Sequence, residues 1–195
     1  MDNFISKNKN VFLAIVAVLI LLIGGTYAWY TMTLSGNKTV KIHAGKLSLD
    51  IDESASEGIS ISNAYPMTDQ EGLATPGYSF TLKNDGNIAS TYTIYLVDLE
   101  LDEGKTRMPD SAVKYNLKKT EYNDDATEKK NATETKQLLS LTGTNPNRIL
   151  DTGTLQPGEY NTYLLKTWMD YSAGNDSQGT VFKTQIKVEG VQIKE

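Results

Sequence analysis

The side chains with the most obvious chemistry in this 195-residue sequence are carboxylates, because it contains 24 acidic residues, one histidine and no cysteine. The lack of cysteine excludes disulfide bonds, thiol catalysis and zinc sites built on thiolates. His43 stands alone, which excludes a centre of several histidines, and no G-x-S-x-G, Walker A or G-x-G-x-x-G motif accompanies it. We therefore expect a protein that is not an enzyme, has no catalytic residue and uses no cofactor.

Acidic side chains gather at the ends of two predicted strands. They are Asp50, Asp52 and Glu53 in the first, and Asp98, Glu100, Asp102 and Glu103 in the second. A glycosidase needs only two carboxylates whose spacing is set in the folded protein. Acids at strand ends usually belong to solvated faces, so we favour that interpretation and keep a hydrolase as an alternative.

A second cluster has the composition of a calcium loop. Asp170, Ser172 and Asp176 place oxygen ligands at alternating positions. The segment lacks a bidentate glutamate at the right distance, and Gly174 stands at the wrong position for an EF-hand. We interpret it as a polar turn with no metal, and keep calcium as the alternative.

A third segment favours self-assembly over catalysis. It is uncharged, prone to form a strand and free of glycine and proline, and it consists of Trp29, Tyr30, Thr31, Met32, Thr33 and Leu34. A free segment of this kind can add itself to a sheet edge of a neighbouring copy, and repeated head-to-tail addition makes a filament. The alternative is pairing within its own domain, or no pairing near the membrane, and the pattern alone does not choose.

The N-terminal sequence indicates the cellular location of the rest of the chain. Lys7 and Lys9 precede Val11–Ile23, which runs for thirteen residues without a polar side chain. Small and turn-prone residues follow up to Ala28. This order is typical of a secretory signal peptide spanning residues 1–28, with cleavage between Ala28 and Trp29.

A retained membrane anchor is the alternative. A span needs about twenty residues, and the count from Val11 to Tyr30 reaches that length. In either case residues 29–38 form an N-terminal extension, residues 39–195 form the domain, and only residues 1–30 would contact a membrane. The protein is then secreted, or it is membrane-anchored at the cell surface. The net charge of −5 argues against nucleic acid as a partner.

Period-two alternation dominates residues 39–195, which predicts strands. The predicted strands are Val40–Ile51 with a bend at Ala44–Gly45, Ile59–Ile61, Phe80–Leu82, Thr91–Leu101, Tyr160–Met169 and Phe182–Val188. Apolar residues on both faces of Thr91–Leu101 predict a central strand covered on both sides. Turn signals at Asn84–Asn87 and Leu155–Gly158 separate the strands. We expect an all-β fold, an antiparallel jelly-roll-like β-sandwich.

Two segments depart from this pattern. Thr68 followed by Glu71 has the spacing of a capping box, which predicts one short helical turn. Residues Tyr122–Thr135 are polar and rich in Asn, Asp, Thr, Glu and Lys, which predicts a mobile loop. The same loop would be the contact surface of a monomeric binding module.

Several short motifs, in order, resemble the TasA and camelysin family. They are Gly25–Tyr30, like the signal-peptide end that the SipW signal peptidase recognises, Ala44–Ile51, Pro76–Gly86, Leu155–Glu159, Trp168–Asp170 and Gln178–Gly179. Each motif is short, and their order and spacing carry the resemblance from Gly25 to Val191.

The resemblance implies an exported jelly-roll subunit of cell-surface or biofilm-matrix fibres of Gram-positive bacteria. In that family the mature N-terminal strand is donated to the next subunit, which maps onto Trp29–Leu34. The implied partners are other copies of the chain, a SipW-type signal peptidase and a minor anchoring or capping homologue. Some relatives carry a metalloprotease label, but this sequence has no zinc motif. The alternative function is a membrane-tethered or secreted monomeric β-sandwich that acts as a binding module.

Overall fold

The computed structural model describes residues 31–35, 49–52, 59–62, 64–144 and 146–193. Their elements are β1 (Thr31–Ser35), β2 (Leu49–Asp52), β3 (Ile59–Ser62), α3 (Asp69–Ala74), β4 (Tyr78–Asn84), β5 (Ser90–Asp98), η1 (Asp110–Ala112), β6 (Val113–Tyr122), β7 (Glu128–Gln137), η2 (Leu138–Ser140), β8 (Thr142–Thr144), β9 (Asn147–Leu155), β10 (Tyr160–Met169), η3 (Asn175–Ser177) and β11 (Val181–Gln192).

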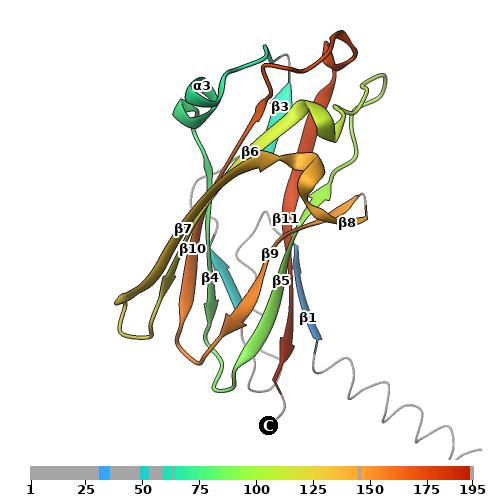
Figure 1. Ribbon diagram of the computed structural model, residues 1–195. Coiled ribbons are helices and arrows are strands. Elements are labelled where there is room, and N and C mark those ends of the chain that lie inside the picture. The colour runs from blue at the N-terminus through green and yellow to red at the C-terminus, as the bar shows by residue number, and fades with distance from the viewer. Residues whose placement is uncertain (1–30, 36–48, 53–58, 63, 145, 194–195) are drawn as a thin grey trace, which may run out of the picture.

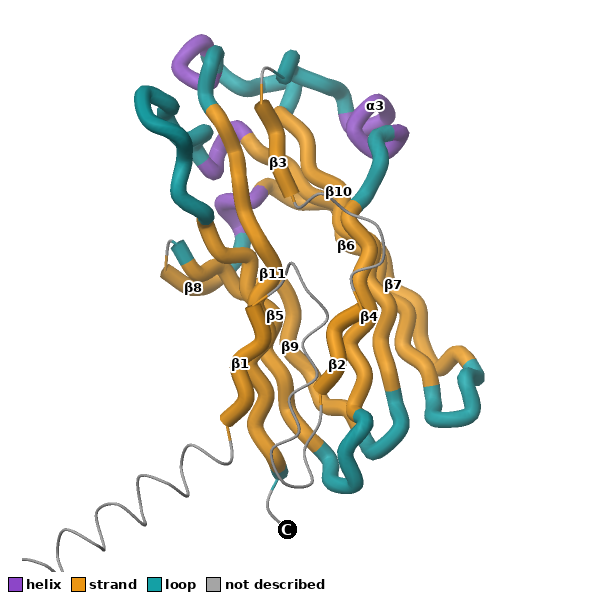
Figure 2. Tube along the Cα trace, turned by 180° about the vertical axis from the view of Figure 1, so that it is seen from behind, coloured by secondary structure: helices purple, strands orange, loops and turns teal. Residues whose placement is uncertain are grey.

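The strands form two antiparallel sheets that face each other in two layers (Figures 1 and 2). One sheet has the order β1-β11-β5-β9-β8, with β3 also paired to β11, and the other has the order β2-β4-β10-β6-β7. The connections β4–β5 and β9–β10 cross from one sheet to the other. The predicted all-β antiparallel fold is confirmed at this level.

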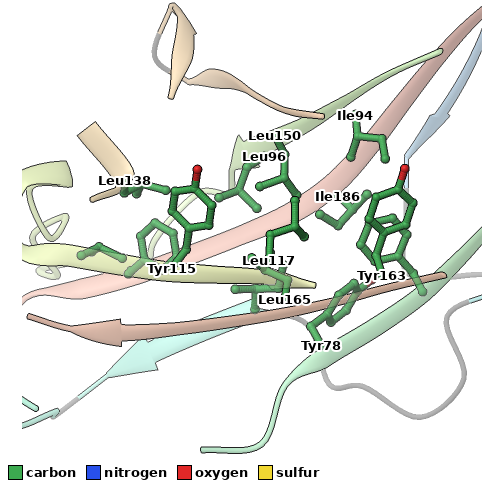
Figure 3. Close-up of a cluster of buried hydrophobic side chains, with 14 of the residues drawn as sticks. Tyr78, Ile94, Leu96, Tyr115, Leu117, Leu138, Leu150, Tyr163, Leu165 and Ile186 are labelled. Carbon is green, nitrogen blue, oxygen red and sulfur yellow. The ribbon is translucent and has the colours of Figure 1, made fainter. Parts of the chain in front are cut away.

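The core lies between the sheets and follows the predicted alternation. Along β11, every second residue from Phe182 to Gly190 is buried. Figure 3 shows Leu117 and Leu165 from one sheet facing Leu96 and Ile186 from the other. Burial of one face of each strand is what imposes a period of two on the sequence.

The two predicted turns meet at one buried asparagine. Asn84 Nδ2 donates to the carbonyls of Ile88 (2.9 Å) and Leu155 (3.0 Å), and Asn84 Oδ1 accepts from Gly86 N (3.0 Å). The Asn84 carbonyl accepts from Gly158 N at 2.8 Å. Gly158 has a φ of 82°, a conformation that favours glycine. Asn84 therefore holds both sheet-crossing connections together.

The predicted helical turn is α3, and its capping box is confirmed. The Thr68 hydroxyl accepts from Glu71 N, and Glu71 Oε2 accepts from Thr68 N at 2.9 Å. Gly72 packs on Trp168, and a Cβ at that position would lie 2.2 Å from the indole ring. The helix therefore covers the end of β10, where both Trp168 and Met169 are buried.

The prediction of a mobile loop at Tyr122–Thr135 is wrong. These residues belong to the hairpin of β6 and β7, which are paired along most of their length with a bulge near Tyr122. Asp125 closes its turn by accepting from Thr127 N at 2.9 Å. The hydrophobic pattern is missing because β7 lies at the sheet edge and is exposed along most of its length, so no face of it requires apolar residues.

The strand predicted at Thr91–Leu101 is central in its sheet, as expected, but it is shorter and only one of its faces is fully buried. It is β5, which ends at Asp98 and lies between β11 and β9. Tyr92, Ile94 and Leu96 are buried, whereas Tyr95 and Val97 on the other face are half-buried, so coverage on both sides is wrong. The Lys187 ammonium lies 5.8 Å from the Tyr95 ring and its side chain partly covers that face.

The predicted signal segment 1–28, its cleavage site at Ala28 and Trp29, Tyr30, the bend at Ala44–Gly45 and His43 lie outside the described residues. Within the described residues, no helix has the length and apolar character needed to cross a membrane.

Candidate self-assembly site at the edge of β11

The structure places the described part of the candidate donor strand at the edge of one sheet. Strand β1 pairs antiparallel with β11, and its register joins Thr31 to Val191 and Ser35 to Lys187. Figures 1 and 2 both show β1 beside β11, and the register places it along the C-terminal half of that strand. Of the two pairings that the sequence allowed, a single copy of the chain adopts the one within its own domain.

Strand β11 receives partners on both sides. On one side β5 pairs with residues Thr184–Gln192. On the other side β3 pairs with Val181–Thr184 and β1 pairs with Lys187–Val191. Without β1, the backbone N–H and C=O groups of β11 that face it would form an open sheet edge, which is a template for another strand.

The segment of β11 opposite β1 is preformed as a strand. Val188 and Gly190 on it are buried, and Glu189 pairs with Lys187 at 2.7 Å on the other face. Its other neighbour β5 holds it in register along nine residue pairs. A strand that took the place of β1 would therefore meet a strand that already pairs with β5 on its other side.

The interior between the sheets contains a polar cluster that was not identified from the sequence. Asp151 Oδ2 accepts from Tyr163 OH (2.8 Å) and Tyr92 OH (3.2 Å), and it lies 3.0 Å from Lys119 Nζ. Asn161 Nδ2 donates to Tyr92 OH at 2.8 Å. These residues come from four strands, so the cluster links the two sheets.

The electrostatics of this cluster suit a structural role. Burial raises the pKa of Tyr163, and the neighbouring Tyr92 and Asp151 raise it further. Burial lowers the pKa of Lys119, but hydrogen bonds with Tyr92 and Glu121 outweigh this effect and raise it overall. The phenol therefore stays neutral and the amine stays charged at neutral pH, so neither is poised as a base or nucleophile.

One of the strand-end acids, Asp98, has a buried side chain, contrary to the solvated face that we favoured. Asp98 accepts from Arg148 Nη1 at 2.8 Å, and Asp110 accepts from the same guanidinium at 2.6 Å and 2.7 Å. Arg107 also lies 3.2 Å from Asp98. Burial lowers the pKa of Arg148, but hydrogen bonds to Asp110 and Asp98 outweigh this effect and raise it overall. Glu100, Asp102 and Glu103 are exposed.

Of the three candidate calcium ligands, Asp170 is held by other side chains, whereas Ser172 and Asp176 are exposed. Asp170 is buried, and its Oδ2 accepts from Ser172 Oγ at 2.9 Å and from the Gln137 amide. Lys114 Nζ lies 3.6 Å from its Oδ1. Burial raises the pKa of Asp170, but the hydrogen bonds from Ser172 and Gln137 outweigh this effect and lower the pKa overall. Among the described residues, no group of three or more His, Cys, Asp or Glu side chains could hold a metal ion.

No protein-family model and no curated protein matches the chain. A protein from Sulfurospirillum deleyianum, known from its crystal structure, is 14% identical with a TM-score of 0.35, covering 72% of this chain and 100% of that one. The infectious bursal disease virus VP2 subviral particle is 8% identical with a TM-score of 0.31, covering 83% and 32%. The Salmonella enterica trimeric lipoprotein SadB is 11% identical with a TM-score of 0.25, covering 87% and 76%. At these identities and TM-scores they assign neither a family nor a function to this chain.

Proposed function

We propose that this protein is an exported structural subunit of cell-surface or biofilm-matrix fibres. Copies join when the N-terminal segment Trp29–Leu34 of one copy pairs with β11 of the next copy, in the place that β1 of that copy occupies in a single chain. The subunit is a jelly-roll-like β-sandwich and not an enzyme, and the resemblance to TasA and camelysin supports the same assignment. Residues 1–28 direct export through a SipW-type signal peptidase.

The observation that carries the proposal is the attachment of β1. It pairs with one edge of β11, and β5 pairs with the other edge of β11. A copy that lends its strand and receives another keeps the same ladder of hydrogen bonds, so exchange costs little free energy.

The chain between β1 and the domain is long enough for exchange. Thirteen residues, 36–48, separate Ser35 from Leu49. Fully extended, such a segment spans at most about 43–47 Å. This length is about three times the radius of gyration of a small domain, so the segment can reach a neighbouring copy. If each copy donates its strand to a third copy, and not to the copy from which it receives one, the contact is heterologous. Repeated contacts of this kind produce an open filament.

Shortening the exported protein by residues 29–34 should abolish filaments while the domain stays folded. The assay is electron microscopy of concentrated protein, with circular dichroism to confirm folding. Leu34→Pro should act in the same direction at full length, because Leu34 lies opposite Val188, whose backbone groups face β1, and proline there removes one ladder donor. Asn37→Pro, beyond the strand, is its matched control and should assemble normally. Filaments that persist without residues 29–34 would contradict strand donation, and a folded wild type that stays monomeric under seeding would favour the binding-module alternative.

A further inference from the structure

The opposite edge of the molecule carries a second strand that is open on one side. In the described residues, β7 is the terminal strand of its sheet and pairs only with β6. Figure 1 shows β7 along the outer edge of that sheet, away from β1. Lys130 and Ala132 are exposed and Glu134 is half-exposed. The edge therefore offers backbone donors and acceptors to a further strand.

Backbone geometry limits how two copies of this edge can pair. Successive residues of a strand direct their N–H and C=O groups to alternate sides, so β6 binds one set and the other set faces outward. In an antiparallel pair, outward-facing residues must lie opposite each other. The residue numbers of any two opposed residues therefore add up to an even number. One residue then lies opposite its own copy, and the twofold axis passes midway between the two. We describe that residue as lying on the axis. Asn131, Ala132 and Thr133 are the central choices within the regular part of β7, which the bulge near Glu121 and Tyr122 ends.

Charge selects one of these registers. With Ala132 on the axis, Lys130 lies opposite Glu134 of the other copy, and the twofold symmetry forms this pair twice. With Thr133 on the axis, Lys130 lies opposite Lys136, which repels. With Asn131 on the axis, Lys130 lies opposite Ala132 and gains no charge partner. Opposed charges on neighbouring strands stabilise pairing and like charges destabilise it.

The surroundings of these side chains allow the pairing. Within the part of the chain that the structure describes, the Lys130 side chain forms neither a hydrogen bond nor an ion pair, so its ammonium group is available to a partner. Glu134 accepts from Tyr115 OH at 3.0 Å and lies 2.6 Å from Lys136 Nζ. These contacts hold the carboxylate in place, and a carboxylate has capacity for a further donor. Ala132 is small enough to lie beside its own copy on the axis.

Lysines on an edge strand usually prevent association. Here the opposite signs at Lys130 and Glu134 are placed symmetrically about Ala132, so the same charges block other registers and favour one. We propose that β7 is a self-association edge, at which two copies of the chain pair antiparallel with Ala132 on the twofold axis. This contact is separate from β1 and β11, and in a filament it would join neighbouring fibres side by side.

A cysteine trap tests the register, because the chain contains no cysteine of its own. The exported protein carrying Ala132→Cys should form a disulfide-linked dimer under mild oxidation, since residues on the axis lie within disulfide reach. Thr133→Cys is the matched control, since Thr133 faces Asn131 in this register. The unpolymerised fraction from size exclusion is used, so that the result does not depend on strand donation. Equal rates for both variants would overturn the proposal.

Charge reversal provides the second arm. Adding Lys130→Glu to Ala132→Cys should slow dimer formation about fivefold or more, because two attractive pairs become repulsive. Adding Glu134→Lys as well should restore the rate, because the pairs are then reversed in sign but again opposite. Lys130 lies opposite Glu121 of its own copy, so thermal unfolding is used to verify that both variants are folded. A double reversal that stays as slow as Lys130→Glu would overturn the register.

Discussion

Replacing Arg148 by alanine should lower the free energy of unfolding by about 3–5 kcal/mol. The guanidinium is almost fully buried and makes hydrogen bonds of 2.6–2.8 Å to both Asp98 and Asp110. Its removal leaves two acidic groups without their main partner, and Asp98 is itself only 6% exposed. The cost comes from these unpaired carboxylates more than from the lost attraction, so chemical denaturation should show a large fall in midpoint.

Lys136→Ala is the matched control for Arg148→Ala. Lys136 also forms a close ion pair, 2.6 Å from Glu134, but both side chains are exposed. Exposed pairs contribute about 0–1 kcal/mol, so this variant should unfold close to wild type. If Arg148→Ala lowers the free energy of unfolding no more than Lys136→Ala does, then Asp98 and Asp110 find water or other donors once the guanidinium is removed.

Replacing Phe182 by alanine should cost a similar amount, about 3–5 kcal/mol. The side chain is fully buried between the sheets at the start of β11. The truncation removes apolar surface from the core and leaves a cavity that the two sheets cannot close. Denaturant unfolding, monitored by tryptophan fluorescence, measures the loss.

Val191→Ala provides the comparison for Phe182→Ala, because Val191 lies on the same strand but is 44% exposed. Its truncation should cost well under half as much. If both variants unfold at nearly the same denaturant concentration, Phe182 does not occupy the core position that β11 assigns to it.

Some strands with one buried face were predictable from the sequence, whereas β6 and β9, which also contribute buried residues, were not predicted. Tyr160–Met169 and the alternation from Phe182 to Val188 agree with β10 and β11, because burial of one face requires an apolar residue at every second position. The capping box of Thr68 and Glu71 was predictable for a similar reason, since its partners are three residues apart.

Features that depend on distant residues were not predictable in the same way. Strand β7 has no apolar period because it lies at an exposed edge, so its sequence resembles a loop. The Arg148 cluster joins residues 38 and 50 positions apart, and nothing local distinguishes its arginine from a surface arginine. The tyrosine hydroxyls of Tyr92 and Tyr163 meet only because two sheets pack together. The segment Thr31–Leu34 could be predicted as a strand, but its partner β11 could not.

Whether β1 must leave its own sheet for copies to join is tested most directly by a disulfide lock. Thr31 and Val191 are register partners, so the variant Thr31→Cys/Val191→Cys should form a disulfide within one copy when oxidised as a monomer. The two single-cysteine variants are the controls. Filament formation is followed by electron microscopy before and after reduction, and the disulfides of reoxidised filaments are examined by non-reducing electrophoresis.

Strand donation predicts that the oxidised double variant stays monomeric, that reduction releases filament growth, and that reoxidised filaments contain disulfides between different copies. Filaments that grow equally well from the oxidised lock, or that contain only disulfides within single copies, would contradict it.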